Sequence, residues 1–221
     1  MYERLYKALY RIRRVEEEIA RVYPSDRIKS PVHLSIGQEA VSVGVCEALR
    51  PQDIVFGTYR GHALYLAKGG ALKPMLAELY GKATGCARGK GGSMHLISLE
   101  AGMMGASAVV GTTIANAVGY AYALRLQRQE AIVASFFGDG ATEEGVFGES
   151  LNFAALKRLP ILFVCENLLR HRRLRAWRDS LSYANRSASL YGPGHCRCSA
   201  PNPSGRASPA SAPEPFDPRR P

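Results

Sequence analysis

A Gly138-Asp139-Gly140 sequence directly follows the apolar run 131–137. Glycine lets the backbone approach a phosphate closely, and the amino end of a following helix supplies N–H groups with positive potential. The Asp139 carboxylate is a hard oxygen ligand that suits Mg²⁺ beside phosphate oxygens. These residue types predict a site for a diphosphate and a magnesium ion, although a simple tight turn stays open as the alternative. A Rossmann dinucleotide site is excluded because Glu143 stands where its third glycine belongs.

Two predicted strands and a helix position this sequence. The continuous apolar runs 131–137 and 161–165 predict buried strands, and residues 143–156 between them predict a helix with Glu143 and Glu144 in its first turn. Strand, helix and strand over this length form a right-handed βαβ unit of a parallel sheet. Ligands of such sheets bind at the carboxyl ends of the strands, where Asp139 lies. The predicted fold class is therefore α/β, a parallel sheet with flanking helices.

Hydrophobic periodicity predicts the other elements. Apolar residues three or four positions apart indicate an amphipathic helix over residues 2–22. The remaining predicted elements are a helix over 36–49, a strand over 53–56, short helices over 63–67 and 71–80, a glycine-rich loop over 81–95, and an alanine-rich helix over 113–126.

The net charge of +10 is concentrated at one end of the chain. Residues 1–167 carry 19 Lys and Arg against 16 Asp and Glu, whereas residues 168–221 carry 10 Arg against three acidic residues. No run of 18 apolar residues predicts a membrane span, and the amino terminus does not resemble a signal peptide. Cys46 and Cys165 lie in apolar runs, and the five cysteines have no zinc spacing. A reducing, cytoplasmic location is therefore expected.

Five segments together resemble one enzyme family. Gly138-Asp139-Gly140, 26 further residues and Asn167 are similar to the thiamine-diphosphate motif, in which two asparagines stand at this spacing. HLSIGQEAVSVGV (33–45), YRGHA (59–63), GKGGSMH (89–95) and VVG (109–111) occur in the order found in the alpha subunit of the decarboxylating component of 2-oxo acid dehydrogenases, the pyruvate, branched-chain and acetoin group. The resemblance covers roughly residues 5–167 and implies the thiamine-diphosphate-binding fold.

The resemblance also implies the residues that bind the cofactors, thiamine diphosphate and Mg²⁺. Arg suits a diphosphate because its planar fork binds two oxygens at once, although a surface salt bridge is the alternative for Arg60. The implied cofactor-binding residues are Tyr59 and Arg60 on the diphosphate, Val110 and Gly111 on the aminopyrimidine, Asp139 on the metal, Gly140 and Ala141 on the diphosphate through backbone N–H groups, and Asn167 within the motif.

Two histidines are the implied catalytic residues. His33 and His62 would line the channel to the thiazolium, and a structural role in the core is the alternative for each. Four further residues of the matching segments are Gln38 and Glu39, expected to fix their helix rather than touch substrate, and Lys90 and His95, placed on a loop that lines the site.

The implied activity is that of an oxidoreductase subunit. In the family, the thiazolium attacks a 2-oxo carbon, CO₂ leaves, and an acyl group passes to the lipoyl arm of an acyltransferase core. The cofactor carries this chemistry, and the protein supplies position and electrostatics. Residues 59–63 and 89–95 favour pyruvate or acetoin over branched-chain substrates. A beta subunit completes the site in a heterotetramer, so this chain would hold half of an active site.

The sequence departs from the family pattern after Asn167. The pattern places a metal-binding Asn at 168 and a Tyr two residues later, where this chain has Leu168 and Arg170. Residues 168–221 contain no Val, Ile, Met or Lys and hold 8 of the 13 prolines. This composition predicts a disordered tail after a partial thiamine-diphosphate-binding domain of residues 1–167, incomplete at its carboxyl end. A catalytically dead pseudo-subunit with an incomplete metal site is therefore the alternative function.

A slip of the reading frame at about codon 168 is our hypothesis for this change of composition. Arg, Pro, Ala, Ser and Gly without Lys, Ile or Met are typical of a GC-rich gene read out of register. A basic tail that binds nucleic acid is the rival interpretation. The scattered aromatic residues and the absence of Lys do not form a stacking surface, so nucleic acid is not an expected partner. Sequencing the DNA around codon 168 tests the hypothesis.

Overall fold

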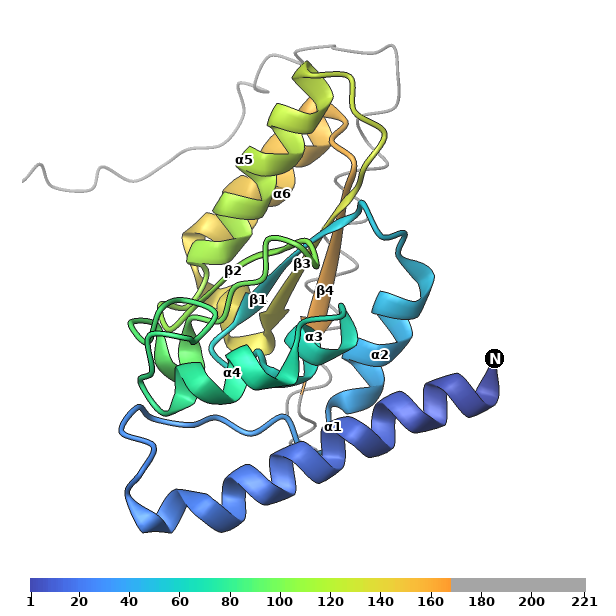
Figure 1. Ribbon diagram of the computed structural model, residues 1–221. Helices are drawn as coiled ribbons and strands as arrows, with labels where there is room; N and C mark the ends of the chain where they lie inside the picture. The colour runs from blue at the N-terminus through green and yellow to red at the C-terminus, as the bar shows by residue number, and fades with distance from the viewer. Residues whose placement is uncertain (168–221) are drawn as a thin grey trace, which may run out of the picture. The chain divides into compact units, whose positions relative to one another are not determined.

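Four parallel strands form one sheet in the computed structural model, which describes residues 1–167. The strand order is β2-β1-β3-β4, and every pair of neighbours is parallel (Figure 1). The strands are β1 (Ile54–Thr58), β2 (Met103–Ser107), β3 (Val133–Gly138) and β4 (Ile161–Glu166). The predicted α/β class with a parallel sheet is confirmed.

Helices cover both faces of this sheet. Successive side chains of a strand point to opposite faces, so Val55 joins a core with helices of one layer while Ile54 and Phe56 pack on the other. The first layer consists of α1 (Tyr2–Val22), α2 (Glu39–Ala48), α3 (His62–Ala67) and α4 (Leu72–Leu79). The second consists of α5 (Thr112–Leu126) and α6 (Gly145–Lys157), which lie side by side (Figure 1).

The alanine-rich helix α5 packs closely on the sheet, as its composition predicts. Ala117 and Ala121 are fully buried against Ile54, Phe56 and Val133. Small side chains let the helix backbone approach the strands, so α5 packs closely against β1 and β3.

Strand β2 was not expected from the sequence. Its residues include Gly105, Ala106 and Ser107, which have low β-propensity and no alternating apolar pattern. Pairing with β1 places this segment in the sheet despite that composition. Tertiary contacts therefore override local preference here.

Helix α6 begins later than its acidic residues predict. Asp139–Glu143 form a short 3-10 helix, and Glu144 is extended with φ −81° and ψ 135° before α6 starts at Gly145. The Thr142 hydroxyl donates to the Asp139 carbonyl at 2.6 Å and closes this turn. The prediction that Glu143 and Glu144 lie in the first helical turn is therefore wrong.

Two further expectations need smaller corrections. Helix α2 starts at Glu39 rather than at residue 36, because Gly37 adopts φ +92° and forms a turn before it. Strand β4 is only partly buried, with Leu162 44% exposed, although its apolar run predicted a strand covered on both faces. In the described part of the chain, β4 is one of the two edge strands of the sheet, and β2 is the other.

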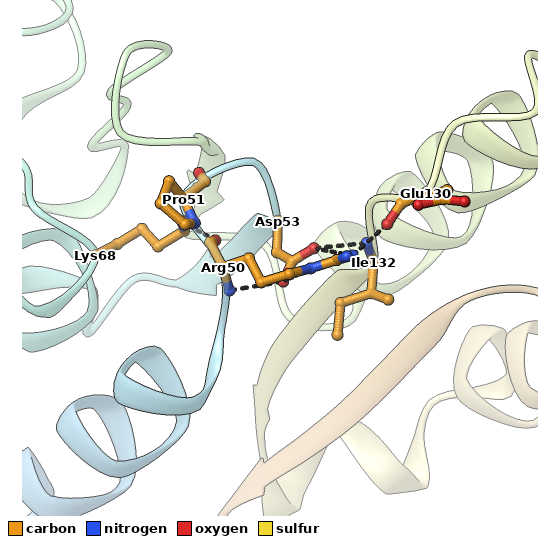
Figure 2. Close-up of polar contacts among 6 residues, drawn as sticks. All are labelled: Arg50, Pro51, Asp53, Lys68, Glu130 and Ile132. Atoms are coloured by element: carbon orange, nitrogen blue, oxygen red, sulfur yellow. Dashed lines mark hydrogen bonds and ion pairs between the residues drawn. The ribbon is translucent and has the colours of Figure 1, made fainter.

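A buried carboxylate ties the amino ends of β1 and β3 together (Figure 2). Asp53, 2% exposed, accepts hydrogen bonds from the backbone N–H groups of Arg50 at 2.7 Å and Ile132 at 3.0 Å. The Arg50 guanidinium pairs with the same carboxylate and also donates to the Glu130 carbonyl. Lys68 donates to the carbonyl oxygens of Arg50 and Pro51. We call this set of contacts the Asp53 clamp. It lies at the amino ends of β1 and β3, whereas the candidate site lies at the carboxyl ends of the strands.

Two short 3-10 segments complete the described elements, at Tyr23–Ser25 and Gly92–Met94. No helix in residues 1–167 is long and apolar enough to cross a membrane. The predicted disordered tail, residues 168–221, and the frame-slip hypothesis lie outside the described residues.

Candidate functional site

A cleft of about 220 Å³ opens at the carboxyl ends of the strands. Parallel strands place their carboxyl ends at one edge, so the segments that follow β1, β2 and β3 meet there. The cleft is lined by Gln38, Thr58, Tyr59, Arg60, Ser107, Val109, Val110, Gly111, Thr113, Phe137, Gly138, Asp139, Gly140, Ala141 and Glu166. Seven of the predicted cofactor-binding residues are therefore brought together in one place.

Arg60 follows β1, and hydrogen bonds to three other residues hold it in position. The Ser35 hydroxyl donates to the Arg60 carbonyl at 3.1 Å, and the Arg60 N–H donates to the Thr58 hydroxyl at 3.2 Å. The guanidinium donates to the Leu34 carbonyl, which uses one of its five N–H groups. The alternative of a surface salt bridge does not apply to Arg60 among the described residues. Within residues 1–167 the other guanidinium N–H groups have no hydrogen-bond partner, so they can bind a phosphate from the wall of the cleft.

The segment after β2 places backbone groups at the cleft. Gly111 has φ +82° and precedes the first residue of α5, and an added Cβ would lie 2.9 Å from Val146 Cγ1. Glycine is therefore required here both by conformation and by space. Val110 is 46% exposed and lines the cleft, so it is accessible to a ligand.

The Gly138–Ala141 turn leaves open space beside its glycines. An added Cβ at either Gly138 or Gly140 would meet no atom within 4 Å. The residues after Gly138 form a 3-10 turn, Asp139–Glu143, rather than the first turn of an α-helix. The turn therefore offers room for an anion at the tip of β3, with the Asp139 carboxylate beside it.

The two predicted catalytic histidines lie in different surroundings. His33 packs its ring against Tyr59, with 4.6 Å between ring centroids. Burial, together with the charges of Arg60 and His62, lowers the pKa of His33, so its imidazole is neutral at pH 7. His33 is thus next to a cleft residue without lining the cleft itself.

His62 is fully buried and does not line the cleft. Its Nδ1 lies 3.0 Å from Glu16 Oε1, and its Nε2 lies 2.8 Å from Ser93 Oγ. Acid, imidazole and hydroxyl stand in the order of a hydrolase triad, but Glu16 and Ser93 are also 0% exposed. A substrate cannot reach this network, and the placement favours the structural role that the sequence left open for His62.

Gln38 lines the cleft, although it was expected only to fix its helix. Glu39 does fix the helix: its carboxylate accepts from the Gly37 N–H at 2.8 Å and from Arg13 at 2.6 Å. Lys90 and His95 are exposed on the glycine-rich loop and do not line the cleft. The expectation that their loop contributes them to the site is therefore not met in the described residues.

Glu166 was missed by sequence reasoning. It ends β4, lines the cleft and precedes Asn167, which is partly buried but is not a cleft residue. Burial raises the pKa of Glu166 to about 7, with the Arg60 charge acting in the opposite direction. A polar residue that ends a buried strand beside a ligand motif is a signal that could have identified it.

The residues present fit a diphosphate better than a preformed metal site. Arg60 and the open space beside Gly138 and Gly140 suit phosphate oxygens. Within residues 1–167, no group of three or more His, Cys, Asp or Glu side chains could hold a metal ion. Mg²⁺ often binds through one or two carboxylates plus substrate phosphates, so Asp139 suits a metal that arrives with a diphosphate.

Comparison with known proteins identifies the family. The family model described as dehydrogenase E1 component matches residues 7–168. The chain belongs to the dehydrogenase E1 component family. It is 42% identical over 163 residues to the alpha subunit of an acetoin:2,6-dichlorophenolindophenol oxidoreductase from Bacillus subtilis, covering 74% of this chain and 49% of that protein.

Plant E1 alpha subunits are also similar. The mitochondrial pyruvate dehydrogenase E1 alpha subunit of Solanum tuberosum is 37% identical over 189 residues, which cover 86% of this chain and 48% of the relative. The chloroplastic alpha-3 subunit of Arabidopsis thaliana is 42% identical over 171 residues, which cover 75% and 40%. The chain thus spans about half the length of the curated relatives it matches.

Proposed function

We propose that this chain is the alpha subunit of a thiamine-diphosphate-dependent dehydrogenase component. It would serve the oxidative decarboxylation of a pyruvate-like 2-oxo acid, or the cleavage of acetoin, with transfer of the acyl group to a lipoyl arm. The observation that carries the proposal is the single cleft that collects Tyr59, Arg60, Gly111 and Asp139 from the ends of three strands. The names of the relatives, alpha subunits for pyruvate and acetoin, support this substrate range.

Each part of the cleft has one task in this proposal. Arg60 binds the diphosphate through N–H groups that Leu34 does not use, and Gly140 and Ala141 donate backbone N–H groups to it. Asp139 binds Mg²⁺ beside the same phosphates. Val110 and Gly111 contact the aminopyrimidine from the end of β2. Thiamine diphosphate supplies the carbanion chemistry when it is bound.

A beta subunit is the proposed partner, in a heterotetramer that passes acyl groups to a lipoyl-bearing core. The matching relatives are themselves named as alpha subunits. The proposed location is the cytoplasm, since the cysteines carry no sign of a disulfide framework. A pseudo-subunit is the second candidate, and Leu168 in place of a metal-binding Asn is the observation that favours it.

Calorimetric titration of the full chain with thiamine diphosphate and Mg²⁺, with and without the beta subunit, tests the proposal. Saturable binding together with 2-oxo acid turnover in the presence of the beta subunit supports a catalytic subunit. Binding of thiamine diphosphate without turnover supports the pseudo-subunit. No binding under either condition rules out the cofactor assignment.

A further inference from the structure

The carboxylate of Glu78 lies inside the glycine-rich loop and binds four backbone amides. Glu78 is on α4 and is 0% exposed. Its Oε2 accepts from the N–H groups of Ala87 and Gly89 at 2.8 Å each, and its Oε1 accepts from Gly91 at 2.7 Å and Gly92 at 3.1 Å. Backbone N–H groups that converge in this way form an anion-binding nest. The anion in this nest is the protein's own side chain, so the loop is not a phosphate cradle.

Gly85 and Gly91 of this loop are packed too tightly to carry a side chain. An added Cβ on Gly85 would lie 2.3 Å from Glu78 Oε2, and one on Gly91 would lie 2.7 Å from the His95 carbonyl oxygen. Gly89 has φ +77°, a conformation that other residues rarely adopt. Burial alone would raise the pKa of Glu78, but the four amide bonds outweigh it and lower that pKa. The carboxylate is therefore ionised at neutral pH and binds the loop as an anion.

Two hydrogen bonds connect this loop to residues that lie next to the cleft lining, one after β1 and one in β2. Ser93 Oγ lies 2.8 Å from His62 Nε2, and His62 follows Arg60 by two residues at the start of α3. His95 Nδ1 lies 3.2 Å from the Ala106 carbonyl, and Ala106 directly precedes Ser107 of the cleft wall. A shift of the loop would therefore change the contacts of the residues at the carboxyl ends of both β1 and β2.

We infer that Glu78 is a positioning residue for the cleft. Its carboxylate holds residues 85–95 in the conformation in which Ser93 supports the Arg60 wall and His95 supports the Ser107 wall. Glu78 touches no ligand in this role. The effect on thiamine diphosphate rests on the proposed function, whereas the anchoring of the loop and its contact with the cleft walls do not.

Hydrogen exchange of the full chain and of two Glu78 variants tests this inference. Glu78→Gln keeps the side-chain shape but removes the charge and turns one acceptor into a donor. Exchange at the Glu78-bound amides should become about tenfold faster or more, because hydrogen bonds to a charged acceptor are stronger than those to a neutral one. Exchange in residues 58–62 and 103–107 should rise with it. Glu149→Gln, an exposed carboxylate on α6, is the matched control and should leave all three segments unchanged.

Rescue by an added carboxylate separates positioning from general destabilisation. Glu78→Ala leaves the nest empty, so sodium acetate should slow loop exchange again, whereas sodium chloride at equal ionic strength should not. Acetate should also restore thiamine diphosphate affinity, which we expect Glu78→Ala to weaken by about tenfold, the loss of about 1.4 kcal/mol. Failure of acetate to restore loop protection, or unchanged exchange in residues 58–62 and 103–107, would overturn the inference. Failure of the unsubstituted chain to bind the cofactor would instead count against the proposed function.

Discussion

Arg60, which follows β1, and Glu166, which ends β4, line the same cleft, with the end of β3 between them. Arg60 is fixed by Ser35, Thr58 and the Leu34 carbonyl before any ligand arrives. Such preorganisation lowers the entropy lost when a phosphate binds. Glu166 is a carboxyl group whose pKa burial raises to about 7, so its charge changes near physiological pH. At the residue scale, the cleft therefore combines the positive charge of Arg60 with a carboxyl group, Glu166, whose charge changes with pH, in addition to the carboxylate of Asp139.

Replacing Arg60 should weaken the binding of thiamine diphosphate. Arg60→Ala removes a charge-assisted contact and should raise the dissociation constant about tenfold to a hundredfold, from the roughly 1.5–3 kcal/mol of such bonds. Arg60→Lys keeps the charge without the planar fork and should give an intermediate loss. Isothermal titration calorimetry measures both. Arg11→Ala, an exposed arginine on α1, is the control, and an equal loss there would show that the effect is not local.

Glu166 should make the folded chain less stable as pH rises from about 5 to 7. Its folded pKa of about 7 lies above the ordinary value of 4.5, so the unfolded chain ionises first and gains relative to the folded one over this window. Glu166→Gln should remove this slope and raise the free energy of unfolding at pH 8 by about 3 kcal/mol at most. Urea denaturation between pH 4.5 and 8 tests this, and an unchanged slope in the variant would contradict it.

At the element scale, periodicity predicted most of the fold and failed where local signals are weak. Helix α1 and strands β1 and β3 appear close to their expected places because apolar spacing directly reports which face is buried. Strand β2 was missed because Gly105 and Ala106 carry no such pattern and are placed by pairing with β1. The partial burial of β4 depends on its place at the edge of the described sheet, which no local pattern reports.

In the candidate site too, some residues could be predicted from local sequence and others depended on tertiary contacts. Asp139 and Arg60 could be predicted because their residue types and matching segments carry chemical information. His62 could not be placed, because a histidine that lines a channel and one that bonds Glu16 in the core look alike in sequence. Glu166 and Gln38 line the cleft because β4 and the turn before α2 end beside it, which no local pattern reports. The sequence therefore predicted most of the residues that line the cleft, but not the core contacts of His62 or the place of Glu166.

Two glycines at different positions of α5 should respond in opposite directions to alanine. Gly111→Ala forces a side chain into φ +82° and to 2.9 Å from Val146, and should lower the free energy of unfolding by about 1–3 kcal/mol. Gly119 lies inside the helix with nothing within 4 Å of an added Cβ. Gly119→Ala should stabilise by roughly 0.5–1 kcal/mol through helix propensity. Thermal denaturation followed by circular dichroism compares them, and stabilisation by both would refute the assigned strain.

At the scale of the whole described unit, the residues that stabilise the sheet and the residues that line the cleft lie at opposite ends of the same strands. The Asp53 clamp ties the amino ends of β1 and β3, and the cleft lies at the carboxyl ends of the same strands. Changes at the clamp should therefore alter the stability of the sheet while leaving the cleft residues in place. The side chains at the two edges can be tested independently because substitutions without shared partners are usually additive.

Asp53→Ala should destabilise the described unit as a whole. It leaves the N–H groups of Arg50 and Ile132 without their acceptor, and a buried unsatisfied donor costs about 1–3 kcal/mol each. We therefore expect a loss of about 2–4 kcal/mol in urea denaturation. Glu130→Ala is the control, because Arg50 donates its hydrogen bond to the Glu130 carbonyl and the exposed side chain adds only a weaker charge interaction.

The pH dependence distinguishes the clamp from simple loss of packing. Burial alone would raise the pKa of Asp53, but Arg50 and the two backbone N–H groups outweigh it and lower that pKa. Its stabilisation is therefore present above the ordinary aspartate range and is lost as pH falls through the lowered folded pKa. The difference between the unsubstituted chain and Asp53→Ala should shrink at acid pH. A difference that stays constant down to the lowest pH at which the chain is folded would mean that side-chain volume, rather than the ionised carboxylate, holds β1 to β3.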